Sequence, residues 1–146
     1  MTYKKASHAV YDCRYHIVWI TKYRRKCLAK LVQESVQKII EWVCKDLYIT
    51  PIAIGMEEDH VHLYLSIPLV HPIPYVVNLL KWRSSHTIFR VEKFKAHLKQ
   101  FYWWEKKSLW AVWYFCATVW IVDRETIKTY VEQQWQEDVE GTEIEL

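Results

Sequence analysis

The chain has 146 residues, of which 51% are hydrophobic and 25% charged, with only two glycines and four prolines. This composition predicts one folded domain and excludes a disordered or low-complexity protein. No apolar run reaches the roughly 18 residues of a membrane span, and the first residues lack the apolar core of a signal peptide. We therefore expect a cytoplasmic protein without membrane contact. The four cysteines contain no Cys-x-x-Cys pair, so we expect reduced packing residues.

The charge is divided unevenly along the chain. The last ten residues, 137–146, hold five of the 17 acidic side chains and no lysine or arginine. Residues 1–136 therefore carry all 20 basic side chains against 12 acidic ones, a net charge of +8. We expect one domain over residues 1–136 followed by an acidic tail. The basic charge of residues 1–136 suits a polyanion such as nucleic acid, although a charged run is more often only a solvated surface.

Three strands and a helix are expected in the first half of the chain. Residues 10–21 are rich in β-branched and aromatic side chains, which predicts a strand. Residues 29–47 repeat apolar side chains at spacings of three and four, which predicts an amphipathic helix. Residues 48–55 again predict a strand, in which Pro51 favours a sheet edge or a bulge. Strict alternation of apolar and polar side chains predicts another strand over residues 60–67.

The second half predicts two helices around one more strand. Residues 75–94 predict a helix with Pro74 in its first turn. Residues 95–109 are basic and aromatic without a clear period, and we expect a loop. Residues 111–121 predict a buried strand, and residues 123–136 a helix capped by its first residue. This element order predicts an α+β fold: a ferredoxin-like or RRM-like antiparallel sheet with helices on one face and an additional C-terminal helix.

Two histidines alternate along one predicted strand. His60 and His62 project from the same face, with Cα atoms about 7 Å apart, so two imidazoles could hold one metal ion. Asp59, directly before them, slightly favours a metal site. Taken alone, the pattern fits exposed strand histidines at least as well.

Tyr130 and Gln134 lie one turn apart on the last predicted helix and share a face. A tyrosine can act as a covalent nucleophile, and an amide oxygen can be a metal ligand. The simpler interpretation is an interfacial aromatic residue beside a surface amide. The two residues alone leave both interpretations open.

Basic residues are interleaved with aromatic ones in three places. Cations neutralise phosphates and ring faces stack on unpaired bases, a combination that binds single-stranded nucleic acid. About half of the aromatic residues are expected in the core or in a subunit interface instead. The basic candidates for DNA contacts are Lys22, Arg24, Arg25, Lys81, Arg83, Lys106 and Lys107.

Four segments, in this order and spacing, resemble a known family: SHAVYDCRYHIVWITKYRRKCL, MEEDHVHLYLSIP, KWRSS and YFCATVWIVDRETIKTYVEQQ. They are similar to the single-tyrosine HUH transposases of bacterial and archaeal insertion sequences, the IS200-like transposases. The similarity runs from about Tyr3 to Gln136. A His-hydrophobic-His pair followed by a helix with Tyr-x-x-x-Gln is far more specific than either part.

The resemblance implies a metal-dependent enzyme that cleaves and rejoins single-stranded DNA at insertion-sequence ends and recognises DNA hairpins. It implies Tyr130 as the nucleophile of a 5′-phosphotyrosine intermediate. It also implies His60, His62 and Gln134 as ligands of a divalent metal, Mg²⁺ or Mn²⁺, without a small-molecule cofactor. Members of the family carry both histidines on the central strand and work as homodimers.

The chain departs from the family pattern at Trp82, Trp113 and Trp120, where small residues are usual. Because Trp120 precedes the helix with Tyr130, a large side chain there puts the movement of that helix in question.

Two other functions remain open. A non-catalytic module for single-stranded or hairpin nucleic acid would leave the four site residues to coincidence, and a metal-dependent hydrolase would need the histidines but not the tyrosine.

Overall fold

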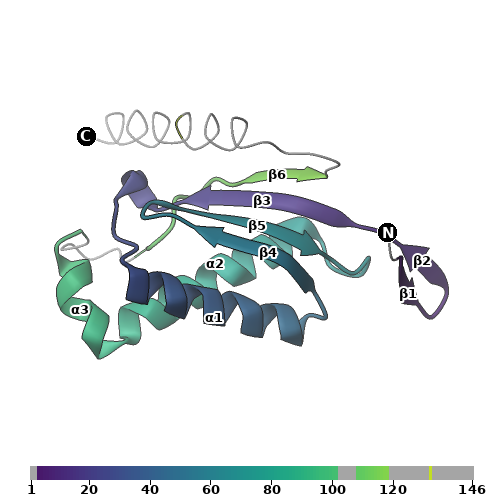
Figure 1. The fold of residues 1–146 in the computed structure, drawn as a ribbon, viewed down its shortest axis with the longest axis horizontal. Helices are drawn as coiled ribbons and strands as arrows, with labels where there is room; N and C mark the ends of the chain where they lie inside the picture. Colours follow the sequence, from purple (N-terminus) through teal and green to yellow (C-terminus); the bar gives the residue numbers. More distant parts are fainter. Residues whose placement is uncertain (1–2, 102–107, 119–131, 133–146) are drawn as a thin grey trace.

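The computed structural model describes residues 3–101, 108–118 and 132 of the chain. The elements, shown in Figure 1, are β1 (Lys4–Ala6), β2 (Ala9–Tyr11), β3 (Arg14–Ile20), the 3₁₀ turn η1 (Lys22–Arg24), α1 (Lys30–Asp46), β4 (Thr50–Met56), β5 (His60–Ser66), α2 (Ile73–Arg90), α3 (Glu92–Lys99) and β6 (Phe115–Thr118). None of the described helices is long and apolar enough to cross a membrane.

The main sheet has the strand order β4-β5-β3-β6, and every neighbouring pair is antiparallel. With α1 connecting β3 to β4 and α2 and α3 between β5 and β6, this is the ferredoxin-like arrangement of two interleaved β-α-β units. In Figure 1, α1 and α2 lie together on one face of the sheet. The predicted α+β fold is confirmed, and β5 is a central strand.

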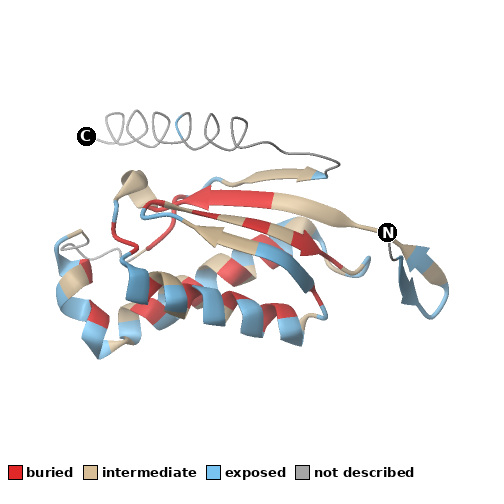
Figure 2. Cartoon of the chain, in the orientation of Figure 1, coloured by how far each residue is buried: buried red, intermediate tan, exposed pale blue. Residues whose placement is uncertain are grey.

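The core lies between the sheet and helices α1 and α2, where Figure 2 shows most of the buried residues. The apolar face of α1 is buried, as its sequence period predicts. From β5, Val61, Leu63 and Leu65 are at most 2% exposed and belong to the same cluster. Since alternate strand residues point to opposite faces, this burial turns His60 and His62 away from the helices.

Two of the four prolines, Pro51 and Pro74, lie where the sequence predicts them. β4 is an edge strand, and its register against β5 shifts between Pro51 and Ala53, the irregularity that a proline without an N–H favours. Pro74 lies in the first turn of α2, where a missing backbone donor costs nothing.

Three elements, β1, η1 and α3, were not expected from the sequence. The strand predicted over residues 10–21 breaks after β2, which pairs with β1 in a separate exposed hairpin, before β3 begins. The helix predicted over residues 75–94 ends at Arg90, and a second helix, α3, begins after Val91. The loop predicted over residues 95–109 is therefore wrong for residues 95–99, and Phe94 and Leu98 of α3 are buried one turn apart. An eight-residue helix offers only this one apolar repeat, too little to reveal a period.

The strand predicted over residues 111–121 is only partly right, because β6 begins at Phe115. Before it, the carbonyl oxygens of Ala111, Val112 and Trp113 accept hydrogen bonds from Lys81 Nζ. Carbonyls turned toward one ammonium group are not aligned for a strand ladder, which explains the late start. Residues 119–121 and the helix predicted over residues 123–136 lie outside the described residues.

Candidate active site

His60 and His62 lie side by side on β5, as their alternation predicts, with ring centroids 5.8 Å apart and ring planes 34° apart. Both are partly exposed, and their alternation with the buried Val61 and Leu63 places them on the sheet face opposite α1 and α2. Their direct cross-strand partners on β3 are Ile20 and Val18, which are fully buried. The imidazoles therefore border an apolar wall that limits the access of water from that side.

His60 is held by a buried carboxylate. Asp59 is 7% exposed, and its Oδ1 lies 2.8 Å from His60 Nδ1, while its Oδ2 lies 2.8 Å from Arg24 Nε. Burial raises the pKa of Asp59, but the hydrogen bonds and the charges of His60 and Arg24 outweigh burial and leave that pKa below its ordinary value. An ionised carboxylate only accepts hydrogen bonds, so His60 Nδ1 donates, and in the neutral imidazole Nε2 then keeps a lone pair for a ligand.

His62 depends on a glycine in the neighbouring strand. Gly55 of β4 pairs directly with His62, and a Cβ built on Gly55 would overlap Cε1 and Nε2 of the imidazole. Glycine thus provides the space that the ring occupies. The sequence interpretation missed this residue, although one of only two glycines in the chain, inside a strand-like segment, is a signal of close approach.

The polar face continues along β3 and β5 beyond the histidine pair. His16 and Tyr64 are direct cross-strand partners, and their rings stack with centroids 4.4 Å apart and planes 2° apart. Arg14 donates to the Tyr64 hydroxyl at 3.0 Å and also pairs with Asp12. Burial lowers the pKa of His16, which favours its neutral form. The sequence interpretation did not single out these residues, although they follow the alternation that identified the histidine pair.

The histidine pair fits part of a divalent-metal site. It offers two imidazole nitrogens, one of them oriented by a carboxylate in the manner usual around protein-bound metals. In the part of the chain that the structure describes, no three His, Cys, Asp or Glu side chains gather as a complete ligand set. Gln134, the third ligand implied by the resemblance, and Tyr130, the implied nucleophile, lie outside the described residues.

Three basic candidates lie in η1 or directly after it. Arg24 joins the histidine site through its ion pair with Asp59. Lys22 Nζ and the Arg25 guanidinium lie 5.5 Å and 4.9 Å from the centroid of the Tyr23 ring. This part of the expected DNA-binding set is therefore beside the histidine site.

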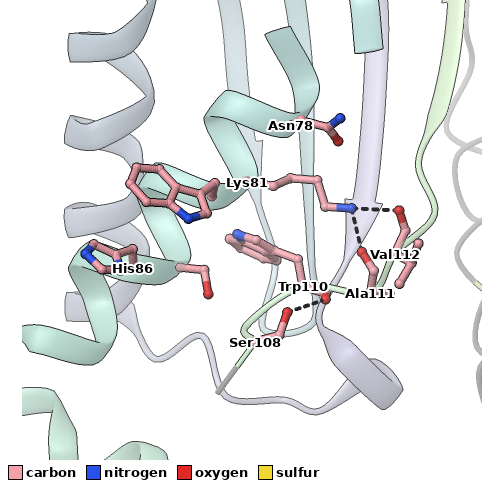
Figure 3. Close-up of a pocket in the computed structure, with 9 residues that line it drawn as sticks. Asn78, Lys81, His86, Ser108, Trp110, Ala111 and Val112 are labelled. Atoms are coloured by element: carbon pink, nitrogen blue, oxygen red, sulfur yellow. Dashed lines mark hydrogen bonds between the residues drawn. The ribbon is translucent and has the colours of Figure 1, made fainter. Parts of the chain in front are cut away.

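The candidates on α2 belong to the helical layer and not to the histidine face. Lys81 Nζ donates to the carbonyls of Ala111 at 2.5 Å and Val112 at 3.0 Å, as Figure 3 shows. The Arg83 guanidinium lies 5.0 Å from the Trp42 ring of α1. The remaining candidates, Lys106 and Lys107, lie outside the described residues.

A cavity of about 520 Å³ lies between α2 and residues 108–112 (Figure 3). On its α2 side, Trp82 stacks on His86 with ring centroids 4.9 Å apart. Trp82 is 60% exposed and Trp113 is 59% exposed, so neither tryptophan displaces core side chains. The fold therefore accommodates both departures from the family pattern; the third, Trp120, lies outside the described residues.

A family model and two known relatives all match this chain to transposases. The family model described as "Transposase IS200 like" matches residues 9–134. The ISDra2 transposase TnpA of Deinococcus radiodurans is 31% identical over 131 residues, which are 90% of each chain. The transposase for insertion sequence element IS200 of Salmonella typhimurium is 27% identical over 143 residues, 98% of this chain and 90% of that relative.

Solved structures extend the comparison to the fold. The crystal structure of a putative transposase from Deinococcus radiodurans has a TM-score of 0.78 and 33% identity, covering 90% of this chain and 97% of that one. A REP-associated tyrosine transposase bound to a REP hairpin has a TM-score of 0.55 at 13% identity, covering 94% and 74%, a likeness of fold alone. The match over residues 9–134, together with these relatives, shows that the chain belongs to the IS200-like transposase family.

Proposed function

We propose that this transposase cleaves and rejoins single-stranded DNA at insertion-sequence ends through a 5′-phosphotyrosine on Tyr130. One observation carries the proposal: His60 and His62 lie together on the central strand, with His60 fixed by Asp59. Membership of a transposase family supports DNA cleavage and strand transfer as the reaction. The residue roles follow from the sequence resemblance, with His60, His62 and Gln134 as the ligands of Mg²⁺ or Mn²⁺.

The chemistry needs one nucleophile and no external energy source. The Tyr130 oxygen, having lost its proton, bonds to the scissile phosphorus, and the departing O3′ takes up a proton to become a 3′-hydroxyl. Because the phosphotyrosine keeps the energy of the phosphodiester, a second 3′-hydroxyl can attack the same phosphorus and release the tyrosine, joining new ends without ATP. When bound, the divalent ion would polarise the phosphate and stabilise its developing charge.

The DNA substrate that we propose carries hairpins near the cleavage sites. The REP-associated relative, which shares the fold, is bound to a REP hairpin, and this supports hairpin recognition here. Phosphate contacts are proposed for Lys22, Arg25, Arg83, Lys106 and Lys107. Lys81 already donates to backbone carbonyls, so we expect a smaller contribution from it than the sequence suggests.

Replacing both His60 and His62 by alanine should reduce metal-dependent cleavage at least about 100-fold, because the ion loses its imidazole ligands. Hairpin binding should stay within about twofold, since other side chains make the proposed phosphate contacts. Cleavage is measured on denaturing gels with single-stranded oligonucleotides from the DNA that flanks the gene, and binding by fluorescence anisotropy. His86→Ala on α2 is the matched control and should cleave normally.

Cleavage that persists in EDTA or in the double alanine variant would contradict the metal role. Hairpin binding by the unaltered protein without any cleavage would favour the alternative of a non-catalytic binding module.

We also propose a homodimer in which each site is shared between the two copies. Within the described residues, β6 is the last strand of the sheet order and pairs with β3, and the edge strand of a sheet is a common place for pairing with a second copy. The sequence predicts a link of only two or three residues, within Ile121 to Asp123, between the last strand and the helix with Tyr130. So short a link leaves that helix little freedom to fold back over its own sheet.

Mixing two inactive variants should restore cleavage if the sites are shared. One variant carries His60→Ala and His62→Ala, the other Tyr130→Phe. After subunit exchange, each heterodimer would hold one complete set of both histidines and the tyrosine, and up to about half of the dimers would be heterodimers by random mixing. Heterodimers that form, as shown by native mass spectrometry, yet stay inactive would mean that each copy uses its own tyrosine.

A further inference from the structure

A chain of charge-assisted hydrogen bonds ends on His60. Arg24 Nε lies 2.8 Å from one oxygen of the Asp59 carboxylate, and the other oxygen lies 2.8 Å from His60 Nδ1. The side chain of Asp59 is only 10% exposed, against 30% for Arg24 and 17% for His60. A carboxylate removed from water to this degree depends on its protein partners for both its charge and its orientation.

An unusual backbone turn brings Arg24 to this carboxylate. Tyr23 and Arg24 have φ angles of 58° and 52°, two consecutive non-glycine residues in the left-handed region. Such a turn persists only where surrounding contacts hold it. Here Arg24 N donates to the Thr21 carbonyl at 2.8 Å, and Thr21 N donates to the Asp59 carbonyl at 2.9 Å. The turn is thus fixed to the residue that its arginine contacts.

Arg24 differs from its basic neighbours in the partner of its side chain. Lys22 Nζ and the Arg25 guanidinium lie over the Tyr23 ring, whereas Arg24 pairs with a buried acid. If the guanidinium were lost, Asp59 would keep only His60 as a side-chain partner among the contacts described above. The carboxylate could then turn toward water, and His60 would lose the acceptor that keeps its proton on Nδ1.

We propose that Arg24 is a positioning residue, which acts through Asp59 to hold His60 in the orientation and tautomer that present Nε2 to a divalent ion. This role replaces the DNA contact expected for Arg24 from the basic cluster. The proposal rests on the proposed function for its metal, but the geometry of the three side chains exists without one.

The test compares Arg24→Gln with Arg24→Lys and with Lys26→Gln, which removes a charge of the same sign from an exposed residue of the same cluster. The ¹⁵N chemical shifts of the His60 ring, recorded where the imidazole is neutral, report its tautomer. We expect the Nδ1–H form in the unaltered protein and in Lys26→Gln, and a mixture in Arg24→Gln. Mn²⁺ binding, followed by calorimetry, should weaken about 10- to 100-fold in Arg24→Gln and recover in part in Arg24→Lys.

An unchanged His60 tautomer and unchanged Mn²⁺ affinity in Arg24→Gln would overturn the proposal. If this variant also lost more hairpin affinity than Lys26→Gln, Arg24 would be a DNA contact. Neither readout requires cleavage, so an unaltered protein that does not cut DNA would defeat the proposed function and leave this inference standing.

Circular dichroism shows whether Arg24→Gln folds, and Asp59→Asn provides a second variant if it does not. Arg24 and His60 contact different oxygens of the Asp59 carboxylate, and asparagine replaces one of these oxygens by an NH₂ group, which only donates. Since the charged Arg24 can also only donate, the remaining oxygen should face Arg24 and the NH₂ group should face His60 Nδ1. We expect the same loss of tautomer preference as in Arg24→Gln. A His60 that remains in the Nδ1–H form in Asp59→Asn would equally overturn the proposal.

Discussion

Tyr130→Phe should abolish the covalent protein–DNA adduct, with a loss of about 10³-fold or more, because only the hydroxyl that would attack the phosphorus is removed. The phenyl ring keeps the size of the side chain, so hairpin affinity should stay within about twofold of the unaltered protein. The adduct is measured as a species that survives denaturant on a gel after incubation with single-stranded element ends and Mg²⁺. Tyr75→Phe, which removes a hydroxyl from an exposed tyrosine of α2, is the matched control and should leave the adduct unchanged.

An undiminished adduct in Tyr130→Phe would refute the nucleophile. A variant that loses hairpin binding together with the adduct would instead indicate that the ring is required for the DNA complex.

Gly55→Ala should reduce metal-dependent cleavage about 100-fold. This effect is large for a substitution that adds one methyl group and lies far from Tyr130 in the sequence. The added Cβ would overlap the His62 imidazole, which must turn out of its place beside His60. Mn²⁺ affinity should fall with the cleavage rate, whereas hairpin affinity should not change. Calorimetry and the cleavage gel measure the first two effects.

Ala53→Ser is the control for this variant. Ala53 precedes Gly55 by two residues on the same edge strand, is exposed and pairs with Tyr64, so one added atom there leaves His62 untouched. Normal cleavage by Gly55→Ala, with an unchanged Mn²⁺ affinity, would show that the position of the His62 ring does not matter.

Periodicity predicted two central elements of the fold. The three-and-four spacing predicted α1, and the alternation of residues 60–67 predicted β5 with its two faces, because both patterns reflect burial against one core. Elements that depend on contacts between residues distant in the sequence were not predicted by periodicity. The late start of β6 depends on Lys81, which binds carbonyls 30 residues or more further along the chain, a contact that no local pattern shows.

In the site, too, a local sequence pattern predicts some features, whereas others depend on contacts between residues distant in the sequence. That His60 and His62 share a face follows from the two-residue repeat of a strand, and the sequence predicted it. The contact between Arg24 and Asp59 spans 35 residues and requires a left-handed turn without glycine, for which the residues at that turn give no signal. Arg24 was therefore grouped with its charged neighbours, although its contact is with a buried acid.

Mass spectrometry of the adduct tests the proposed mechanism most directly. After reaction with single-stranded element ends and Mg²⁺, the adduct is digested with nuclease and trypsin, and the modified peptide is sequenced by fragmentation. We predict that the tryptic peptide that begins at Thr129, directly after Lys128, carries a deoxynucleotide 5′-phosphate on Tyr130, with a 3′-hydroxyl on the other DNA product. A nucleotide on another residue, or cleaved DNA with a 5′-phosphate and no attached peptide, would contradict the phosphotyrosine mechanism.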